Sequence, residues 1–86
     1  MDLKVFVLNV FGEDIHDVFV FDSYEKAVNK IRITLKDYYH FDTDTPYLTE
    51  QEMKDVITEM ESIIYDDGEY ESGDDLKFTI DERYVD

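Results

Sequence analysis

An uninterrupted helical stripe of apolar residues between positions 53 and 64 constrains this chain more than any other feature. Thr49 precedes the stripe and Glu52 follows three residues later, the pattern of a capping box at a helix start. Apolar side chains then recur at spacings of three and four, as on one face of an amphipathic helix. They are Met53, Val56, Ile57, Met60, Ile63 and Ile64. Such a helix buries its stripe against another element, so the chain must supply a second layer.

Two apolar runs near the N-terminus supply strands for that layer. Residues 3–11 (LKVFVLNVF) and 17–21 (DVFVF) are rich in β-branched and aromatic residues, and residues 12–14 (GED) between them provide turn chemistry. The pattern predicts a β-hairpin. Both runs are apolar on both faces, so one face of the sheet needs a cover that helices packed on the other face do not provide.

A second helical pattern follows the hairpin. Asp22, with Glu25 three residues later, predicts a capping box. Apolar residues then recur at helical spacing as far as Tyr38, while four of the eight cations of the chain fall on the remaining surface. The outer face of this helix is therefore expected to be the least acidic surface, and Ile33 lies there, off the apolar stripe. The four cations are Lys26, Lys30, Arg32 and Lys36.

The remaining segments complete the predicted fold. Pro46 interrupts the helical pattern, so we expect a loop between the two helices. Residues 69–72 can form a short strand, and residues 76–85 (LKFTIDERYV) begin with the alternation of a half-buried strand. We predict a single globular domain over residues 1–86, of the α+β class and the order ββααβ. Two helices pack on one face of a small three-stranded sheet, antiparallel or mixed, with the short segment as a fourth strand.

Negative charge is the second constraint. The chain has 23 Asp and Glu against 8 Lys and Arg, a net charge of −15. Residues 1–42 hold eight acids and five bases, whereas residues 43–86 hold fifteen acids and three bases. This charge repels nucleic acid and anionic membranes, so we expect direct binding to neither. With 43% hydrophobic residues the chain is too apolar for a disordered acidic tail.

Signatures of export, catalysis and cofactor binding are absent from the sequence. The first apolar run is broken by Asn9, short of a signal peptide or a membrane span, and there is no cysteine. We expect a cytoplasmic protein, in the host cell if a phage encodes it.

His16 and His40 have no nucleophile in a recognisable arrangement, so we predict no enzyme and no cofactor. An EF-hand loop from Asp42 would need Gly where Tyr47 stands, which leaves weak calcium binding by clustered carboxylates as an alternative.

The acids concentrate on two neighbouring segments. From Glu59 to Asp75 the chain has eight acids and no base. Helical periodicity puts three carboxylates on one flank of the 53–64 stripe. The segment 65–75 (YDDGEYESGDD) adds a second row, in which alternate residues of an extended strand are about 7 Å apart, close to the spacing of phosphates along a DNA strand. The predicted partner-binding residues are Glu52, Asp55 and Glu59 in the first row, and Asp66, Asp67, Glu69, Tyr70, Glu71, Asp74 and Asp75 in the second, with Tyr70 as the aromatic anchor.

This profile is similar to that of the small acidic inhibitors that phages and mobile elements make against host nucleic-acid enzymes. Examples are DNA-mimic anti-restriction proteins, uracil-DNA glycosylase inhibitors and some anti-CRISPR proteins. The similarity is one of type and transfers no residue. It implies a non-enzymatic inhibitor or regulator that binds the basic nucleic-acid-binding surface of a partner protein, a host enzyme or effector complex, by DNA mimicry. The alternative of another class is a structural or assembly protein that forms a homodimer through the uncovered sheet face of the hairpin.

Overall fold

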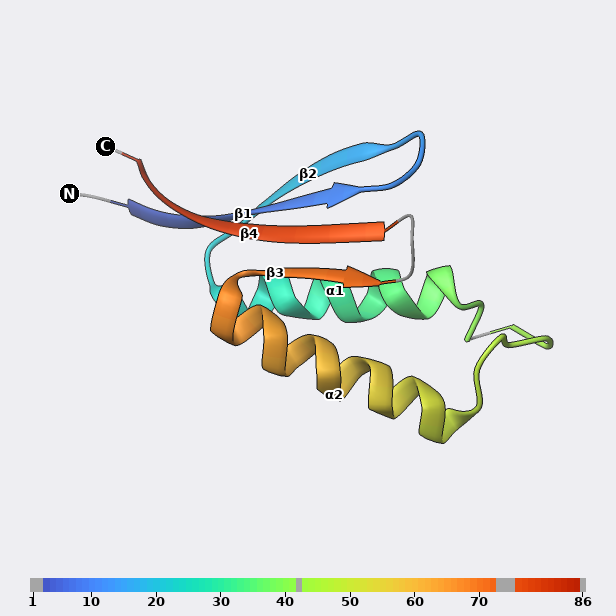
Figure 1. The fold of residues 1–86 in the computed structure, drawn as a ribbon. Coiled ribbons are helices and arrows are strands. Elements are labelled where there is room, and N and C mark those ends of the chain that lie inside the picture. Colours follow the sequence, from blue (N-terminus) through green and yellow to red (C-terminus); the bar gives the residue numbers. More distant parts are fainter. Residues whose placement is uncertain (1–2, 42, 73–75, 86) are drawn as a thin grey trace.

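A computed structural model describes residues 3–41, 43–72 and 76–85, and it has the predicted α+β class (Figure 1). The strands form one antiparallel sheet in the order β2-β1-β4-β3. Both helices lie on the same face of this sheet (Figure 1). The short fourth strand is present. The elements are β1 (Leu3–Phe11), β2 (His16–Phe21), α1 (Tyr24–Tyr38), α2 (Glu50–Asp67), β3 (Glu69–Ser72) and β4 (Leu76–Val85).

The strands β1 and β4 form the centre of the sheet. They pair along their whole lengths, from Leu3 opposite Val85 to Phe11 opposite Lys77. β2 pairs with the other side of β1, and β3 with the other side of β4, so β2 and β3 are the two edges. The ends of β1 and β4 near Leu3 and Val85 extend beyond the helices (Figure 1). Residues 81–85 are consequently exposed on both faces of the sheet.

The first helix begins at a different cap from the predicted one. Ser23 is the N-cap of α1, with extended backbone angles, and its Oγ accepts a hydrogen bond from the Lys26 N–H at 3.2 Å. Asp22 lies one residue too early, and its carboxylate pairs instead with Lys26 Nζ at 2.8 Å. The capping box predicted from Asp22 and Glu25 is therefore wrong. The Glu25 side chain instead reaches α2.

The second helix has the predicted capping box. Thr49 Oγ1 accepts a hydrogen bond from the Glu52 N–H at 3.1 Å, and the Thr49 N–H donates to Glu52 Oε1 at 3.0 Å. At the other end, Gly68 has a left-handed φ of 75° and donates its N–H to Ile64 O at 2.9 Å. The Gly68 carbonyl accepts the Ile80 N–H at 2.8 Å. One glycine therefore ends α2 and places β3 beside β4.

Replacing Gly68 by alanine is expected to lower the free energy of unfolding by about 1–2 kcal/mol, the cost of a left-handed backbone for a residue with a Cβ. A steric clash does not contribute to this loss, because the new Cβ would lie 3.5 Å from Ile80 O, an ordinary van der Waals contact. Urea unfolding measures the change. Asparagine, which tolerates this conformation, should cost less than alanine; equal losses for the two variants would contradict the explanation.

The core lies between the sheet and the two helices. On β2, Phe19 and Phe21 pack against it, so the alternation of the strand turns Val18 and Val20 to the opposite face. These two valines are 54% and 62% exposed, because no described element covers that face. As predicted, the two helices do not cover this face of the sheet. The buried residues include Leu8, Val10, Ala27, Val28, Ile31, Leu35, Met53, Met60, Ile64, Tyr70, Leu76, Phe78 and Ile80.

Candidate acidic interface

The end of α2 and the edge strand β3 carry a dense acidic surface. Asp66 and Asp67 are exposed in the last turn of α2, and Glu69 and Glu71 are exposed on β3. No basic residue lies in that last turn. Carboxylates at a helix C-terminus face the negative end of the helix dipole, which costs about 0.3–1 kcal/mol for each exposed charge. The fold therefore tolerates this charge rather than gaining stability from it.

The two acidic rows meet at a shallow depression of about 210 Å³ between α2 and β3. On the α2 side it is lined by Glu59, Ile63 and Asp67, which are four residues apart and so share one helix face. The β3 side consists of Glu69, Tyr70 and Glu71. Glu59 from the first row thus lies next to the second row. We call Glu59, Asp66, Asp67, Glu69 and Glu71 the acidic interface.

Glu52 and Asp55 lie nearer the start of α2, and both are exposed. The Thr49 N–H hydrogen bond to the Glu52 carboxylate holds the pKa of Glu52 below its ordinary value. Asp55 Oδ1 accepts a hydrogen bond from Gln51 Nε2 at 3.1 Å. Glu52 is therefore engaged in the helix cap, and Glu59 is the member of the first row that reaches the depression.

Positive charge near these carboxylates is sparse. Within the described part of the chain, the one ion pair that involves them joins Lys77 Nζ to Glu71 Oε1 at 3.8 Å across the β3–β4 pair. Both side chains are exposed, and such pairs contribute about 0–1 kcal/mol. The interface therefore retains nearly all of its negative charge. Asp74 and Asp75 of the predicted second row lie outside the described residues.

Tyr70 does not lie where an interface anchor would. Residues on β3 alternate between faces, so Glu69 and Glu71 are exposed while Tyr70 points toward the helices and is 7% exposed. Burial raises the pKa of the Tyr70 hydroxyl above its ordinary value. Ser72, on the same buried face, shares a 2.8 Å hydrogen bond with the Tyr39 hydroxyl. Tyr70 is a core residue at the base of the depression, and we remove it from the predicted contact set.

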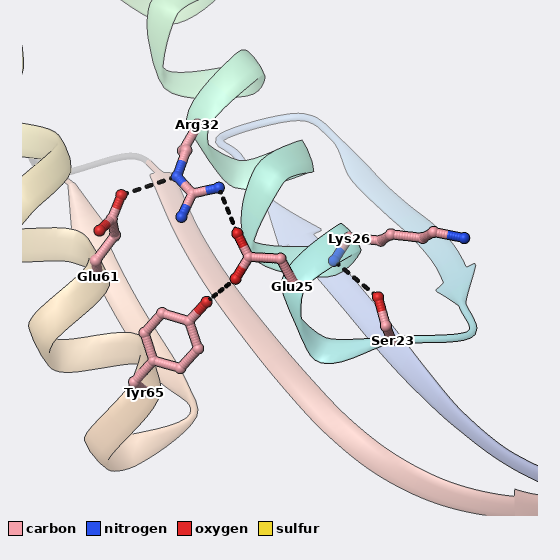
Figure 2. A network of polar contacts seen from close by, with 6 residues as sticks. All are labelled: Ser23, Glu25, Lys26, Arg32, Glu61 and Tyr65. Atoms are coloured by element: carbon pink, nitrogen blue, oxygen red, sulfur yellow. Dashed lines mark hydrogen bonds and ion pairs between the residues drawn. The ribbon is translucent and has the colours of Figure 1, made fainter.

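A polar network between the helices, which sequence reasoning missed, involves Tyr65 (Figure 2). Arg32 of α1 donates through Nε to Glu61 Oε1 at 2.8 Å and through a terminal nitrogen to Glu25 Oε1 at 3.2 Å. The Tyr65 hydroxyl donates to the other oxygen of Glu25, and its ring packs against Tyr24 with centroids 5.3 Å apart. Glu25 and Glu61 thus share one guanidinium, which makes this cluster a brace between α1 and α2.

Replacing Arg32 by methionine is expected to lower the free energy of unfolding by about 1–2 kcal/mol, because two carboxylates lose the charged donor they share. The Arg32 side chain is only 23% exposed, so solvent screens it less than a surface pair. Lys26→Met is the matched control: it also removes one cation, but from an exposed pair, and should cost less than about 0.5 kcal/mol. Equal losses in urea unfolding would contradict a bracing role.

The same network predicts a pH dependence. The hydrogen bonds from Tyr65 and Arg32 hold the pKa of Glu25 below its ordinary value of 4.5. A carboxyl whose pKa is lowered by folding contributes stability that is fully present above its unfolded pKa and is lost as the pH falls through its folded pKa. The stability advantage of the wild type over Glu25→Gln should therefore be constant near neutral pH and shrink below about pH 4.5. A difference that stays constant down to acid pH would contradict this.

The described ranges contain neither a metal cluster nor a helix suited to a membrane. No three Asp, Glu or His side chains in them converge in a way that could hold a metal ion. The calcium alternative rested on loops that include Asp42, Asp74 and Asp75, which lie outside these ranges. No described helix is long and apolar enough to cross a membrane.

Comparison with known proteins identifies no relative from which a site could be transferred. No family model, curated protein or solved structure matches the chain. A functional assignment therefore depends on the geometry and charge of the acidic interface itself.

Proposed function

We propose that this protein is a non-enzymatic inhibitor or regulator that binds the basic, nucleic-acid-binding surface of a partner protein by DNA mimicry. The observation that carries the proposal is the acidic interface, a set of exposed carboxylates on a helix end and an adjoining strand. Within the described part of the chain, a single weak ion pair involves these carboxylates. Surfaces designed for solubility alone intersperse acids with bases. Here the chain has no base from Glu59 to Asp75.

The spacing of the charges supports mimicry of a nucleic-acid backbone. Glu69 and Glu71 are alternate residues of a strand, about 7 Å apart and comparable to successive phosphates. Across the depression, Glu59 and Asp67 are separated by about 12 Å of helix rise. Negative charge on α2 and negative charge on β3 thus flank the depression on its two sides, as phosphates flank a groove of a duplex. The charges of the acidic interface lie on a helix and a strand, so little ordering entropy is lost when a partner binds.

The partner expected from this chemistry presents Arg and Lys along a channel for DNA or RNA. A host restriction enzyme, repair enzyme or CRISPR effector has such a channel, and an inhibitor encoded by a phage or mobile element would gain from blocking it. Attraction between a chain of charge −15 and a basic channel favours fast association that weakens steeply with salt.

Affinity capture from a host lysate with three baits tests the proposal. The first bait is the wild type. The second, the interface-reversed variant, carries D66K, D67K, E69K and E71K. The third, the charge-matched control, carries E13K, D14K, D44K and E50K at exposed acids away from the acidic interface and has the same net charge.

We expect the wild type and the charge-matched control to retain one nucleic-acid enzyme at low salt, and the interface-reversed variant to lose it. Equal loss by both variants would mean that overall charge, rather than this surface, determines binding. A mixture of unrelated basic proteins on the wild-type bait would reject the proposal as well.

A further inference from the structure

The two edges of the sheet differ in chemistry. Edge strands that avoid pairing with other chains are usually short or carry charges. β3 has both features, with four residues and two glutamates. β2 has six residues (HDVFVF), four of them consecutive apolar side chains, and Asp17 is its only acid. β2 therefore has the properties of an edge open to pairing.

The free edge of β2 presents unpaired backbone groups. At the hairpin turn, the Gly12 N–H donates to Ile15 O at 2.8 Å. Residues of an antiparallel pair alternate between bonded and non-bonded positions from that point. By this alternation Asp17, Phe19 and Phe21 exchange hydrogen bonds with β1, whereas His16, Val18 and Val20 direct their N–H and C=O groups to the open edge. No described strand satisfies them.

The helix α1 runs beside this edge and carries a mixed stripe. Lys26, Lys30, Ile33 and Asp37 follow at spacings of four, three and four residues, and so share one helix face. All four residues line two adjoining grooves, of about 400 and 340 Å³, between α1 and β2. Ile33 is 47% exposed there. At the centre of the stripe, Lys30 Nζ lies 4.8 Å from the ring of Phe19.

We propose that a second copy of this chain pairs with β2 edge to edge, antiparallel about a two-fold axis near Phe19, and extends the sheet across both copies. The same axis makes the two α1 helices antiparallel. Positions 26 and 37 are symmetric about the centre of the stripe, as are positions 30 and 33. Lys26 of each copy therefore faces Asp37 of the other, and Lys30 extends over Ile33. The stripe is complementary to itself in this orientation.

Charge selects the β2 edge over the other surfaces for self-association. Pairing through β3 would set Glu69 and Glu71 of two copies against one another. The open sheet face mixes Val18 and Val20 with Glu69 and Asp81, so stacking two such faces would also bring acids together. At the β2 edge the two chains meet through their least acidic half. The acidic interfaces then lie at the two outer ends of the joined sheet, so this dimer does not depend on the proposed function.

Sedimentation velocity over micromolar to submillimolar concentrations tests the dimer. We expect a concentration-dependent dimer for the wild type and a monomer for Val18→Lys, which places a charge on the free edge at an exposed side chain. Glu71→Lys, the control on the β3 edge, should still dimerise. A wild type that remains monomeric, or a dimer that persists in Val18→Lys, would overturn the proposal.

A charge swap tests the orientation of the two copies. Lys26→Asp and Asp37→Lys should each weaken dimerisation about fivefold, and the double variant should recover most of the loss, because it restores the pair with reversed signs. Both side chains are exposed, although Lys26 also pairs with Asp22 of its own chain. Circular dichroism checks that each variant is folded. Two single losses that add up in the double variant would exclude the antiparallel arrangement.

Discussion

Replacing Phe78 by alanine is expected to lower the free energy of unfolding by about 3–5 kcal/mol, the largest stability effect of any substitution considered for this chain. Phe78 is fully buried on β4, between β1 and β3, where the sheet packs against the helices. Truncation removes the apolar transfer energy of the ring and leaves a cavity. A domain of this size has a total stability of about 5–15 kcal/mol, so the variant should be partly unfolded near physiological temperature.

Val20→Ala is the control for Phe78→Ala. Val20 also lies in the sheet, but its side chain is 62% exposed on the uncovered face. Its truncation should cost less than about 1 kcal/mol. Urea unfolding followed by circular dichroism measures both. Similar losses for the two variants would mean that the core does not lie between the sheet and the helices.

The interface-reversed variant is expected to bind the partner at least about 100-fold more weakly than the wild type. Reversing four carboxylates turns attractions into repulsions, and a loss of about 0.7 kcal/mol at each position already amounts to about 2.8 kcal/mol, or two factors of ten. The salt dependence of the remaining binding should be shallower, because fewer charges take part. Isothermal titration at two salt concentrations measures both quantities.

The same variant should not lose stability. Two of its lysines replace aspartates in the last turn of α2, where positive charge interacts favourably with the helix dipole. The lysine at position 71 lies opposite Lys77 and offsets part of this gain, so the free energy of unfolding should stay close to that of the wild type. An interface-reversed variant that binds weakly because it is unfolded would not support the account. A charge-matched control that binds the partner as weakly as the interface-reversed variant would contradict it.

Local patterns predicted most of the fold. The stripe from Met53 to Ile64 and the Thr49–Glu52 box depend on neighbours three or four residues away, and both occur as expected. The cap of α1 was predicted at Asp22 but lies at Ser23, because both residue types favour an N-cap and the backbone angles decide between them. The uncovered sheet face also followed from the sequence, since both hairpin strands are apolar on both faces.

The candidate site was less accessible to sequence reasoning. The alternation of residues 69–72 (EYES) contained the signal that Tyr70 faces away from the glutamates, but the acidic run around it suggested a wholly exposed segment. The network of Arg32 could not be found in this way. Its partner Glu61 lies 29 positions along the chain, and only the packing of α1 against α2 brings them together. The depression beside Glu59 likewise arises from the tertiary arrangement of α2 and β3.

Displacement by DNA tests the central claim most directly. A partner retained on the immobilised wild type at low salt is washed with a short duplex at constant ionic strength, and the eluted protein is measured against a wash with an uncharged polymer. If the acidic interface occupies the nucleic-acid channel, a higher concentration of the duplex releases more of the partner. The partner then never binds this protein and the duplex at the same time. A partner that binds the duplex and remains bound to the immobilised protein would contradict DNA mimicry.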